Sequence, residues 1–129
     1  MSYYSDVKCV MYKKNWEEIK DRIKENTEID EFARDRFINK VSIEERDDIV
    51  ICSWESMNHW DECSDEAVQM FLSYIRTQEY EYNMPYKYIC VGEGCGTETD
   101  IDVQYNYSDD FEMIEKFNII DYRVSIDIF

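Results

Sequence analysis

The amino-acid sequence predicts an α+β domain built on a mostly antiparallel, five-stranded sheet with helices packed on one face. Three observations predict this fold class. Segments with strand-like alternation of apolar residues are interspersed with segments whose apolar residues recur every three or four positions, as in helices. A glycine-rich turn from Gly92 to Gly96 joins two consecutive strand-like segments, as in a hairpin. The 129 residues have the length of one domain, so we assign 1–129 to a single acidic domain.

The first half of the chain predicts a strand, two helices and a second strand. Residues 6–13 form a strand-like run, and Asn15 is in position to cap the helix that follows. The apolar stripe of that helix consists of Trp16, Ile19 and Ile23. A second helix is predicted from Ile29 to about Val41, and the continuous apolar run Ile49–Cys52 predicts a central strand covered on both faces. The segment Ser53–Cys63 has no clear period, so we interpret it as an irregular connection.

The second half predicts a helix, a hairpin, a short helix and a final strand. Ser64 is in position to begin the clearest helix of the chain. Its apolar stripe consists of Val68, Phe71, Leu72 and Ile75. The hairpin strands are Tyr86–Val91 and Thr97–Tyr107, a short helix runs from Asp109 to about Phe117, and Ile120–Ile128 alternates as a final strand. The order β-α-α-β-α-β-β-α-β fits a ferredoxin-like arrangement, although the sequence does not predict the strand order.

Strict alternation in the second hairpin strand predicts one packed face and one wet, acidic face. The face assigned to the core holds Ile101, Val103, Tyr105 and Tyr107. The face assigned to solvent holds Asp100, Asp102, Gln104 and Asn106. The final strand is the candidate free edge of the sheet, so the chain is expected to be a monomer or, through edge pairing, a homodimer.

The charge is far from balanced and unevenly distributed. The chain has 30 acids and 14 bases, a net charge of −16, whereas a magnitude of roughly 2 to 8 keeps a small domain soluble. Residues 1–40 contain nine acids and nine bases, so the whole excess lies downstream. Such a field repels nucleic acids and anionic membranes and attracts cationic partners. We therefore expect a basic protein as partner, with neither direct nucleic-acid contact nor membrane contact.

The cysteine pattern and the lack of a long apolar run predict a cytoplasmic protein. The five cysteines are odd in number and irregularly spaced, which favours reduced thiols over a disulfide framework. No run of roughly 18 apolar residues is available to cross a membrane. The first residues have neither the charged nor the apolar region of a signal peptide.

Motifs that carry chemistry are weak in this sequence. The three glycines of the 92–96 turn precede a strand, whereas a phosphate-binding loop precedes a helix. His59, Cys63, Cys90 and Cys95 have no zinc-like spacing, and the acids of 44–48 do not match a calcium loop. His59 is the only histidine and has no adjacent nucleophile motif. We predict no enzyme activity, metal or cofactor. The alternative to a binding function is a small metal-dependent enzyme.

Two zones combine the residue types expected at an interface. The first is an acid-flanked, tryptophan-rich segment, in which aromatic side chains are typical of interface hot spots. Its residues are Trp54, Glu55, Trp60, Asp61 and Glu62. The alternative is that both indoles lie in the core. The second zone is the acidic row of the hairpin and the helix after it: Glu98, Asp100, Asp102, Asp109, Asp110, Glu112 and Glu115.

Acids on one face of a strand recur about every 6.6 to 7 Å, a spacing on the scale of charges along a nucleic-acid backbone. In size, acidity and lack of catalytic motifs, the chain resembles small inhibitors encoded by bacteriophages and mobile elements, including nucleic-acid-mimicking anti-restriction and anti-CRISPR proteins. The resemblance is one of class, without a diagnostic motif. It implies an inhibitor that occupies the basic, nucleic-acid-binding surface of a target, in the host cytoplasm. An immunity protein or antitoxin that neutralises a basic nuclease toxin is the alternative binding function.

Overall fold

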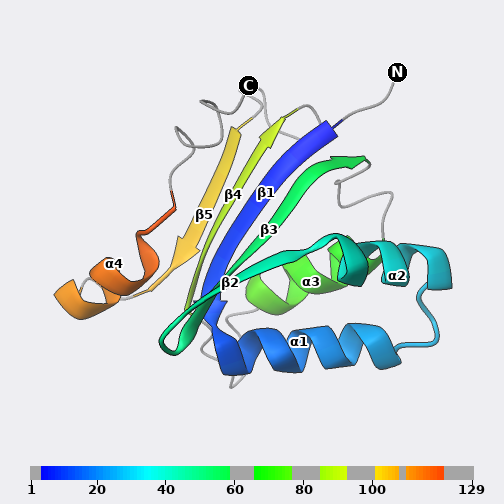
Figure 1. Ribbon diagram of the computed structural model, residues 1–129, viewed down its shortest axis with the longest axis horizontal. Coiled ribbons are helices and arrows are strands. Elements are labelled where there is room, and N and C mark those ends of the chain that lie inside the picture. Colours follow the sequence, from blue (N-terminus) through cyan, green and yellow to red (C-terminus); the bar gives the residue numbers. More distant parts are fainter. Residues whose placement is uncertain (1–3, 59–65, 77–84, 93–100, 108–109, 121–129) are drawn as a thin grey trace.

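The computed structural model describes residues 4–58, 66–76, 85–92, 101–107 and 110–120 (Figure 1). These residues form an α+β fold, as predicted. The strands are β1 (Tyr4–Tyr12), β2 (Ser42–Arg46), β3 (Ile49–Asn58), β4 (Tyr86–Gly92) and β5 (Ile101–Asn106). The helices are α1 (Lys13–Glu25), α2 (Glu31–Lys40), α3 (Glu66–Arg76) and α4 (Phe111–Phe117). No helix in these ranges has the length and apolar character needed to span a membrane.

The five strands form one antiparallel sheet in the order β2-β3-β1-β4-β5. Helices α1 and α2 connect β1 to β2, and α3 connects β3 to β4. Strands β1 and β2 are separated by β3, and β3 and β4 are separated by β1, so each helical connection skips one strand. This split connectivity is that of a ferredoxin-like fold. Strand β5 extends it beyond β4.

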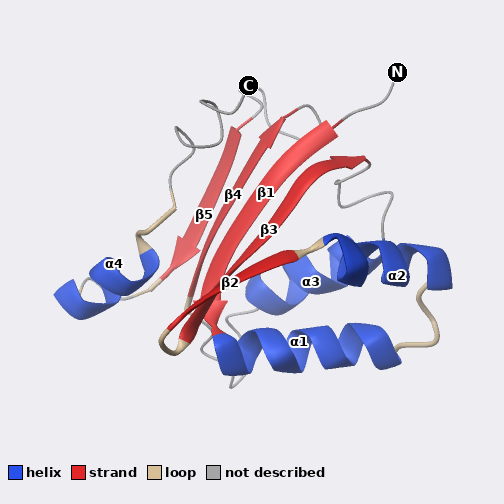
Figure 2. Cartoon of the chain, viewed as in Figure 1, coloured by secondary structure: helices blue, strands red, loops and turns tan. Residues whose placement is uncertain are grey.

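Alternating side chains divide the core into two layers, one on each face of the sheet. On one face, Cys9, Cys52 and Tyr88 pack against α1, α2 and α3. On the other face, Val10 and Ile51 pack in a cluster that includes Phe117 of α4 and Ile120. Figure 2 shows α1–α3 together and α4 apart from them. The prediction that helices cover one face thus holds for α1–α3, while α4 packs on the opposite face.

The helix α1 starts earlier than predicted. Asn15 lies inside the helix, and Tyr12 holds the N-cap position with extended backbone angles and no side-chain cap. The backbone N–H of Lys13 donates instead to the carbonyl oxygen of Asp48 at 2.9 Å, which ties the helix start to the β2–β3 turn. The stripe of Trp16, Ile19 and Ile23 is buried, as predicted.

The region from 42 to 58 differs most from the prediction. Strand β2 was not predicted, because all five of its residues are exposed and leave no apolar period. Strand β3 continues to Asn58, so the segment interpreted as irregular is a strand in its first half. The predicted run Ile49–Cys52 is buried at the start of that strand. Asp47, at positive φ of 55°, makes the turn that joins β2 to β3, a conformation that Asp tolerates better than most residues.

Two predicted helices are confirmed with shorter bounds. Helix α2 begins after Asp30, whose carboxylate accepts from the N–H of Ala33 at 3.2 Å. Helix α4 begins after Asp110, whose carboxylate accepts from the N–H of Glu112 at 3.2 Å. The stripe of Val68, Phe71, Leu72 and Ile75 in α3 is buried, as predicted. The predicted strand Ile120–Ile128 lies outside the described residues, except for Ile120.

Candidate interaction surfaces

Helix α4 directs its acids to solvent and its base to the sheet. Asp110, Glu112 and Glu115 are exposed. Phe117 is fully buried, and its ring packs edge-on against Tyr12 at a centroid distance of 5.3 Å and stacks on Tyr107 at 5.9 Å.

The only base of α4 is held at the inner side of the helix. The Nζ of Lys116 donates to Asp48 Oδ2 at 3.1 Å and lies 5.2 Å from the centre of the Tyr12 ring. The hydrogen bond to Asp48 raises the pKa of Lys116 above its usual value, because it stabilises the charged ammonium. Glu112 and Glu115 of α4 and its capping residue Asp110 are therefore exposed, while Lys116 is bound to residues of the sheet and the β2–β3 turn and is also stabilised by the charge of Glu112.

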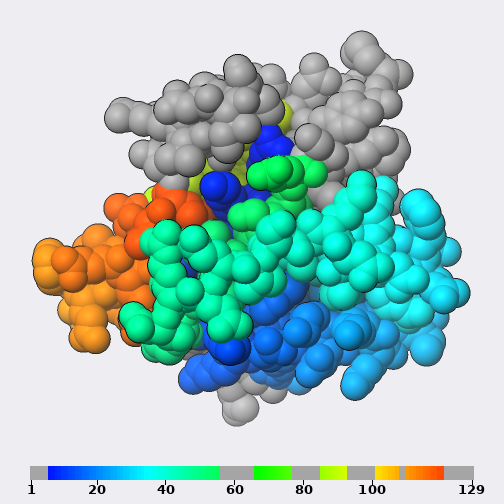
Figure 3. All heavy atoms as spheres, viewed as in Figure 1, coloured from blue at the N-terminus to red at the C-terminus, as the bar shows by residue number. Residues whose placement is uncertain are grey.

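The β2–β3 hairpin adds a second set of acids beside α4. It contains Glu44, Glu45, Asp47 and Asp48, all exposed. Figure 3 shows the green surface of this hairpin next to the orange surface of α4. We call the hairpin acids and the α4 acids together the acidic end. The sequence indicated the hairpin acids only as a poor match to a calcium loop, because nothing local to 44–48 shows that α4 packs beside them.

Several bases lie at the same end and moderate its charge. Lys13 contacts Glu45 at 3.1 Å and Arg46 contacts Glu44 at 2.9 Å, in pairs whose members are all about half exposed. Lys13 and Lys14, with Tyr12 and Asp48, also line an open hollow. Exposed pairs of this kind are weak and are screened by salt. The acids of the acidic end are thus only partly balanced by bases.

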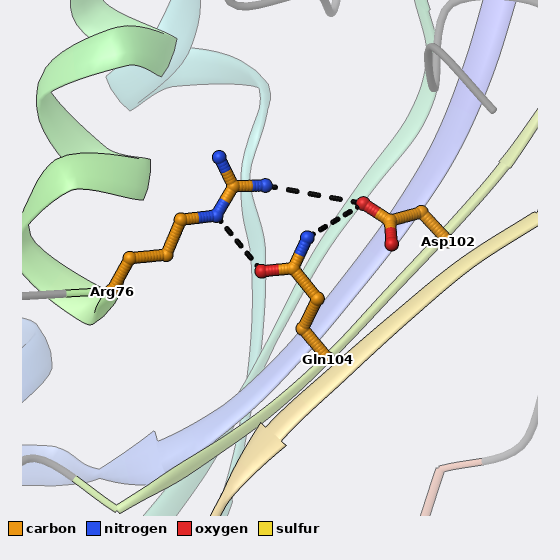
Figure 4. Close-up of polar contacts among 3 residues, drawn as sticks. All are labelled: Arg76, Asp102 and Gln104. Atoms are coloured by element: carbon orange, nitrogen blue, oxygen red, sulfur yellow. Dashed lines mark hydrogen bonds and ion pairs between the residues drawn. The ribbon is translucent and has the colours of Figure 1, made fainter.

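Asp102 belongs to a polar cluster on the helix side of β5 and not to an exposed acidic row (Figure 4). Gln104 Nε2 donates to Asp102 Oδ2 at 2.8 Å, and Arg76 Nε donates to Gln104 Oε1 at 2.8 Å. Arg76 also lies 3.9 Å from Asp102 Oδ2. The Asp102 side chain is 20% exposed. Its charge is compensated by Arg76, the last residue of α3. This contact corrects the assignment of Asp102 to an exposed acidic row that contacts a partner.

The two faces of β5 are only partly as predicted, since Ile101 and Tyr107 pack against the second core cluster while the polar face is not an exposed acidic row. Val103 and Tyr105, assigned to the core, are 43% and 64% exposed. The register places Asp102 opposite Cys90, whose side chain lies in the helix-side core, and Val103 opposite Ile89 on the other face. On that other face, Val103 and Tyr105 are the apolar side chains of β5 that remain exposed.

Trp54 is a core residue, which corrects its assignment as a contact residue. Its side chain is fully buried among Trp16, Phe37 and Phe71, at ring distances of 5.0 to 5.9 Å. The indole Nε1 donates to the carbonyl oxygen of Phe37 at 3.0 Å. This carbonyl lies in the last turn of α2, so the bond ties Trp54 to the end of that helix. Strand β3 turns Trp54 towards the helices, and the next residue, Glu55, is exposed.

The remaining predicted contact residues lie outside the described residues: Trp60, Asp61, Glu62, Glu98, Asp100 and Asp109. Asn58 pairs with Tyr4, and Gly92 pairs with Ser5, so both lie at the same end of the sheet. Ile101 pairs with Val91 at that end as well.

Helix α4 follows the other end of β5, where Asn106 pairs with Tyr86. The six residues of β5 separate the two ends by roughly 20 Å, at about 3.4 Å per residue. Within the described residues, the predicted hairpin–helix zone is divided, because Asp102 lies on the side of the sheet that α3 covers and α4 packs on the opposite face. The exposed acids at α4 lie beside the β2–β3 hairpin.

The described residues carry only part of the net charge. They contain 19 acids and 13 bases. The other 11 acids occur with one arginine in the remaining 37 residues.

The cysteines are only partly as predicted. Cys9 and Cys52 are free and buried. Burial raises the pKa of both thiols well above the usual value, because it disfavours the thiolate. Cys90, in contrast, is disulfide-bonded, which corrects its assignment as a reduced thiol. The cysteine pattern therefore no longer argues for a reducing compartment.

Within the described residues, no group of three or more His, Cys, Asp or Glu side chains is arranged to hold a metal ion. The Arg76–Gln104–Asp102 cluster joins a helix to a strand through bonds among its own members. Comparison with known proteins found no matching family model, no similar curated protein and no similar solved structure.

Proposed function

We propose that this chain is an acidic inhibitor that binds the basic, nucleic-acid-binding surface of another protein. The observation that carries the proposal is the outward face of α4, where Asp110, Glu112 and Glu115 are exposed while Lys116 is bound to Asp48. The net charge of −16 supports it, because a field of this sign accelerates the encounter with a cationic surface. Counter-defence or host takeover by a bacteriophage is the proposed biological setting, in the host cytoplasm.

Helix α4 is suited to present these acids because it is anchored from beneath. Phe117 is buried against the sheet face opposite α1–α3, and Met113 accepts a hydrogen bond from the hydroxyl of Tyr12 at 3.6 Å. An anchored helix loses little conformational freedom when it binds, which favours affinity. The acids of the β2–β3 hairpin extend the same surface.

Neutralisation of a basic nuclease toxin uses the same chemistry and differs only in the target. Identification of the captured protein separates the two functions. A nucleic-acid-binding effector of host defence supports the first, and a toxin nuclease encoded beside the chain supports the second.

The test is capture of partners from a host lysate on the immobilised chain, at low salt and at about 1 M salt, where the Debye length falls to about 3 Å. We expect a basic protein at low salt and its loss at high salt. Recovery of no protein at either salt concentration contradicts the proposal.

Two double variants sharpen this experiment. Glu112→Gln with Glu115→Gln removes two acids from α4 and is expected to lower capture. Asp21→Asn with Glu25→Gln removes two exposed acids from α1, where bases balance acids, and is expected to leave capture unchanged. Equal capture by the two variants shows that α4 is not the contact surface.

A further inference from the structure

Strand β2 is an edge strand with exposed side chains. In the part of the chain that the structure describes, it pairs with β3 on one side and has no strand on the other. All five residues are exposed. Figure 3 shows the strand at the surface between α2 and α4. An edge of this kind presents backbone N–H and C=O groups to a further strand.

The register identifies which backbone groups face outward. Arg46 and Ile49 flank the two-residue turn Asp47–Asp48, so they form a hydrogen-bonded pair. Pairs alternate along an antiparallel ladder, so Glu44 also bonds to β3, while Ile43 and Glu45 direct their N–H and C=O groups away from it. Two residues therefore offer a donor and an acceptor each, spaced as an incoming strand requires.

The charge of this edge selects the occupant. Four of the five residues from Glu44 to Asp48 are acids. The ion pairs that Glu44 and Glu45 make with Arg46 and Lys13 are about half exposed, so cations of a partner can replace these bases at little cost. A second copy of the chain is a poor occupant, because it brings another net charge of −16 to the same edge.

We propose that β2 binds an extended, lysine- or arginine-rich segment of the partner as an added antiparallel strand. The backbone bonds at Ile43 and Glu45 provide affinity, and the side chains on the two faces provide selectivity. One face of the edge presents Glu44. The other presents Ile43, which is 41% exposed, and Glu45, so the favoured segment alternates basic and apolar residues. This inference rests on the proposed function, since it names how a basic partner is held.

The probe is a synthetic peptide in which lysine alternates with valine, and the control peptide alternates glutamate with valine. Binding is measured by calorimetry, and amide hydrogen exchange of the unmodified chain is measured by NMR. We expect the lysine peptide alone to bind and to slow exchange at Ile43 and Glu45 at least tenfold. Exchange at Glu44 is expected to change little, because its amide already bonds to β3.

Proline at position 43 removes an outward N–H without removing a bond to β3. Ile43→Pro is expected to weaken peptide binding at least tenfold, and Ile43→Val to bind like the unmodified chain. The amide signal of Ile51, which bonds to Glu44 across the hairpin, reports whether the hairpin is retained. If Ile43→Pro disrupts the hairpin, the exchange result on the unmodified chain decides.

The inference is overturned if the lysine peptide does not bind, if the glutamate peptide binds equally well, or if binding leaves exchange at Ile43 and Glu45 unchanged. Protection that appears without peptide and grows with protein concentration identifies a second copy as the occupant and also overturns it. Lysate capture separates this failure from failure of the proposed function. Capture that survives Ile43→Pro but falls in the Glu112→Gln, Glu115→Gln variant refutes strand addition at β2 and leaves the proposed function standing.

Discussion

Replacing Trp54 by phenylalanine tests the assignment of this residue to the core. The substitution removes the hydrogen bond from the indole to the Phe37 carbonyl, a loss of about 1–3 kcal/mol for a buried bond. It also leaves a void beside Trp16 and Phe71, which we put at about 1 kcal/mol because most of the ring volume is retained. The free energy of unfolding is therefore expected to fall by about 2–4 kcal/mol. For a chain of this size the midpoint of thermal unfolding falls by roughly 10 °C.

The matched control is Trp16→Phe. The free energy of unfolding of both variants is measured by urea titration. Trp16 is buried in the same cluster, but within the described residues its indole donates no hydrogen bond. We expect Trp54→Phe to be the more destabilising by about 1–3 kcal/mol, the contribution of the hydrogen bond. The reasoning is refuted if the two variants lose equal stability. It is also refuted if folded Trp54→Phe protein loses partner capture, since a core residue makes no partner contact.

Two further predictions concern titration and thiol reactivity. Asp48→Asn is expected to bring the pKa of Lys116 back towards 10.5, as measured by an NMR titration of its ammonium group. Because the folded pKa is raised, the stability that this contact contributes is present below pH 10.5 and is lost as pH rises through the folded pKa; a wild-type advantage that grows at alkaline pH contradicts this. Cys9 and Cys52 are expected to react with a thiol reagent only after unfolding, because they are buried with raised pKa values. Labelling of either thiol in the folded protein, followed by mass spectrometry, shows that the assignment is wrong.

Elements with a buried face were predictable from the sequence. Helix α3 was predicted because its apolar stripe from Val68 to Ile75 is the face that packs on the sheet. Strand β2 has no buried face, so no periodicity marks it. Its existence depends on pairing with β3, a contact that follows from the turn at Asp47 and not from the composition of the strand.

Alternation in β5 revealed two faces but not that the polar face would pack towards α3. We assigned the apolar face to the core because burial of apolar area usually dominates. The apolar face packs in part, through Ile101 and Tyr107, but the polar face also lies towards a helix, because Arg76 and Gln104 satisfy the carboxylate of Asp102 there. That arrangement depends on residues 26 or more positions apart, which no local pattern reports.

The candidate site was predictable in the same partial way. The exposure of Glu112 and Glu115 followed from the helical period, since Phe117 and Met113 occupy the packed side. The residues beside α4 could not be predicted, because Asp48 and Tyr12 are distant in the sequence and contact the helix only in the folded chain.

A displacement assay tests the central claim most directly. The captured basic protein is purified and bound to a labelled nucleic acid, and the chain is titrated into this complex while the label is followed by fluorescence anisotropy. We predict that the chain displaces the nucleic acid, that displacement weakens steeply with salt, and that the Glu112→Gln, Glu115→Gln variant requires a higher concentration. A stable complex that contains the protein, the nucleic acid and the chain together contradicts the claim.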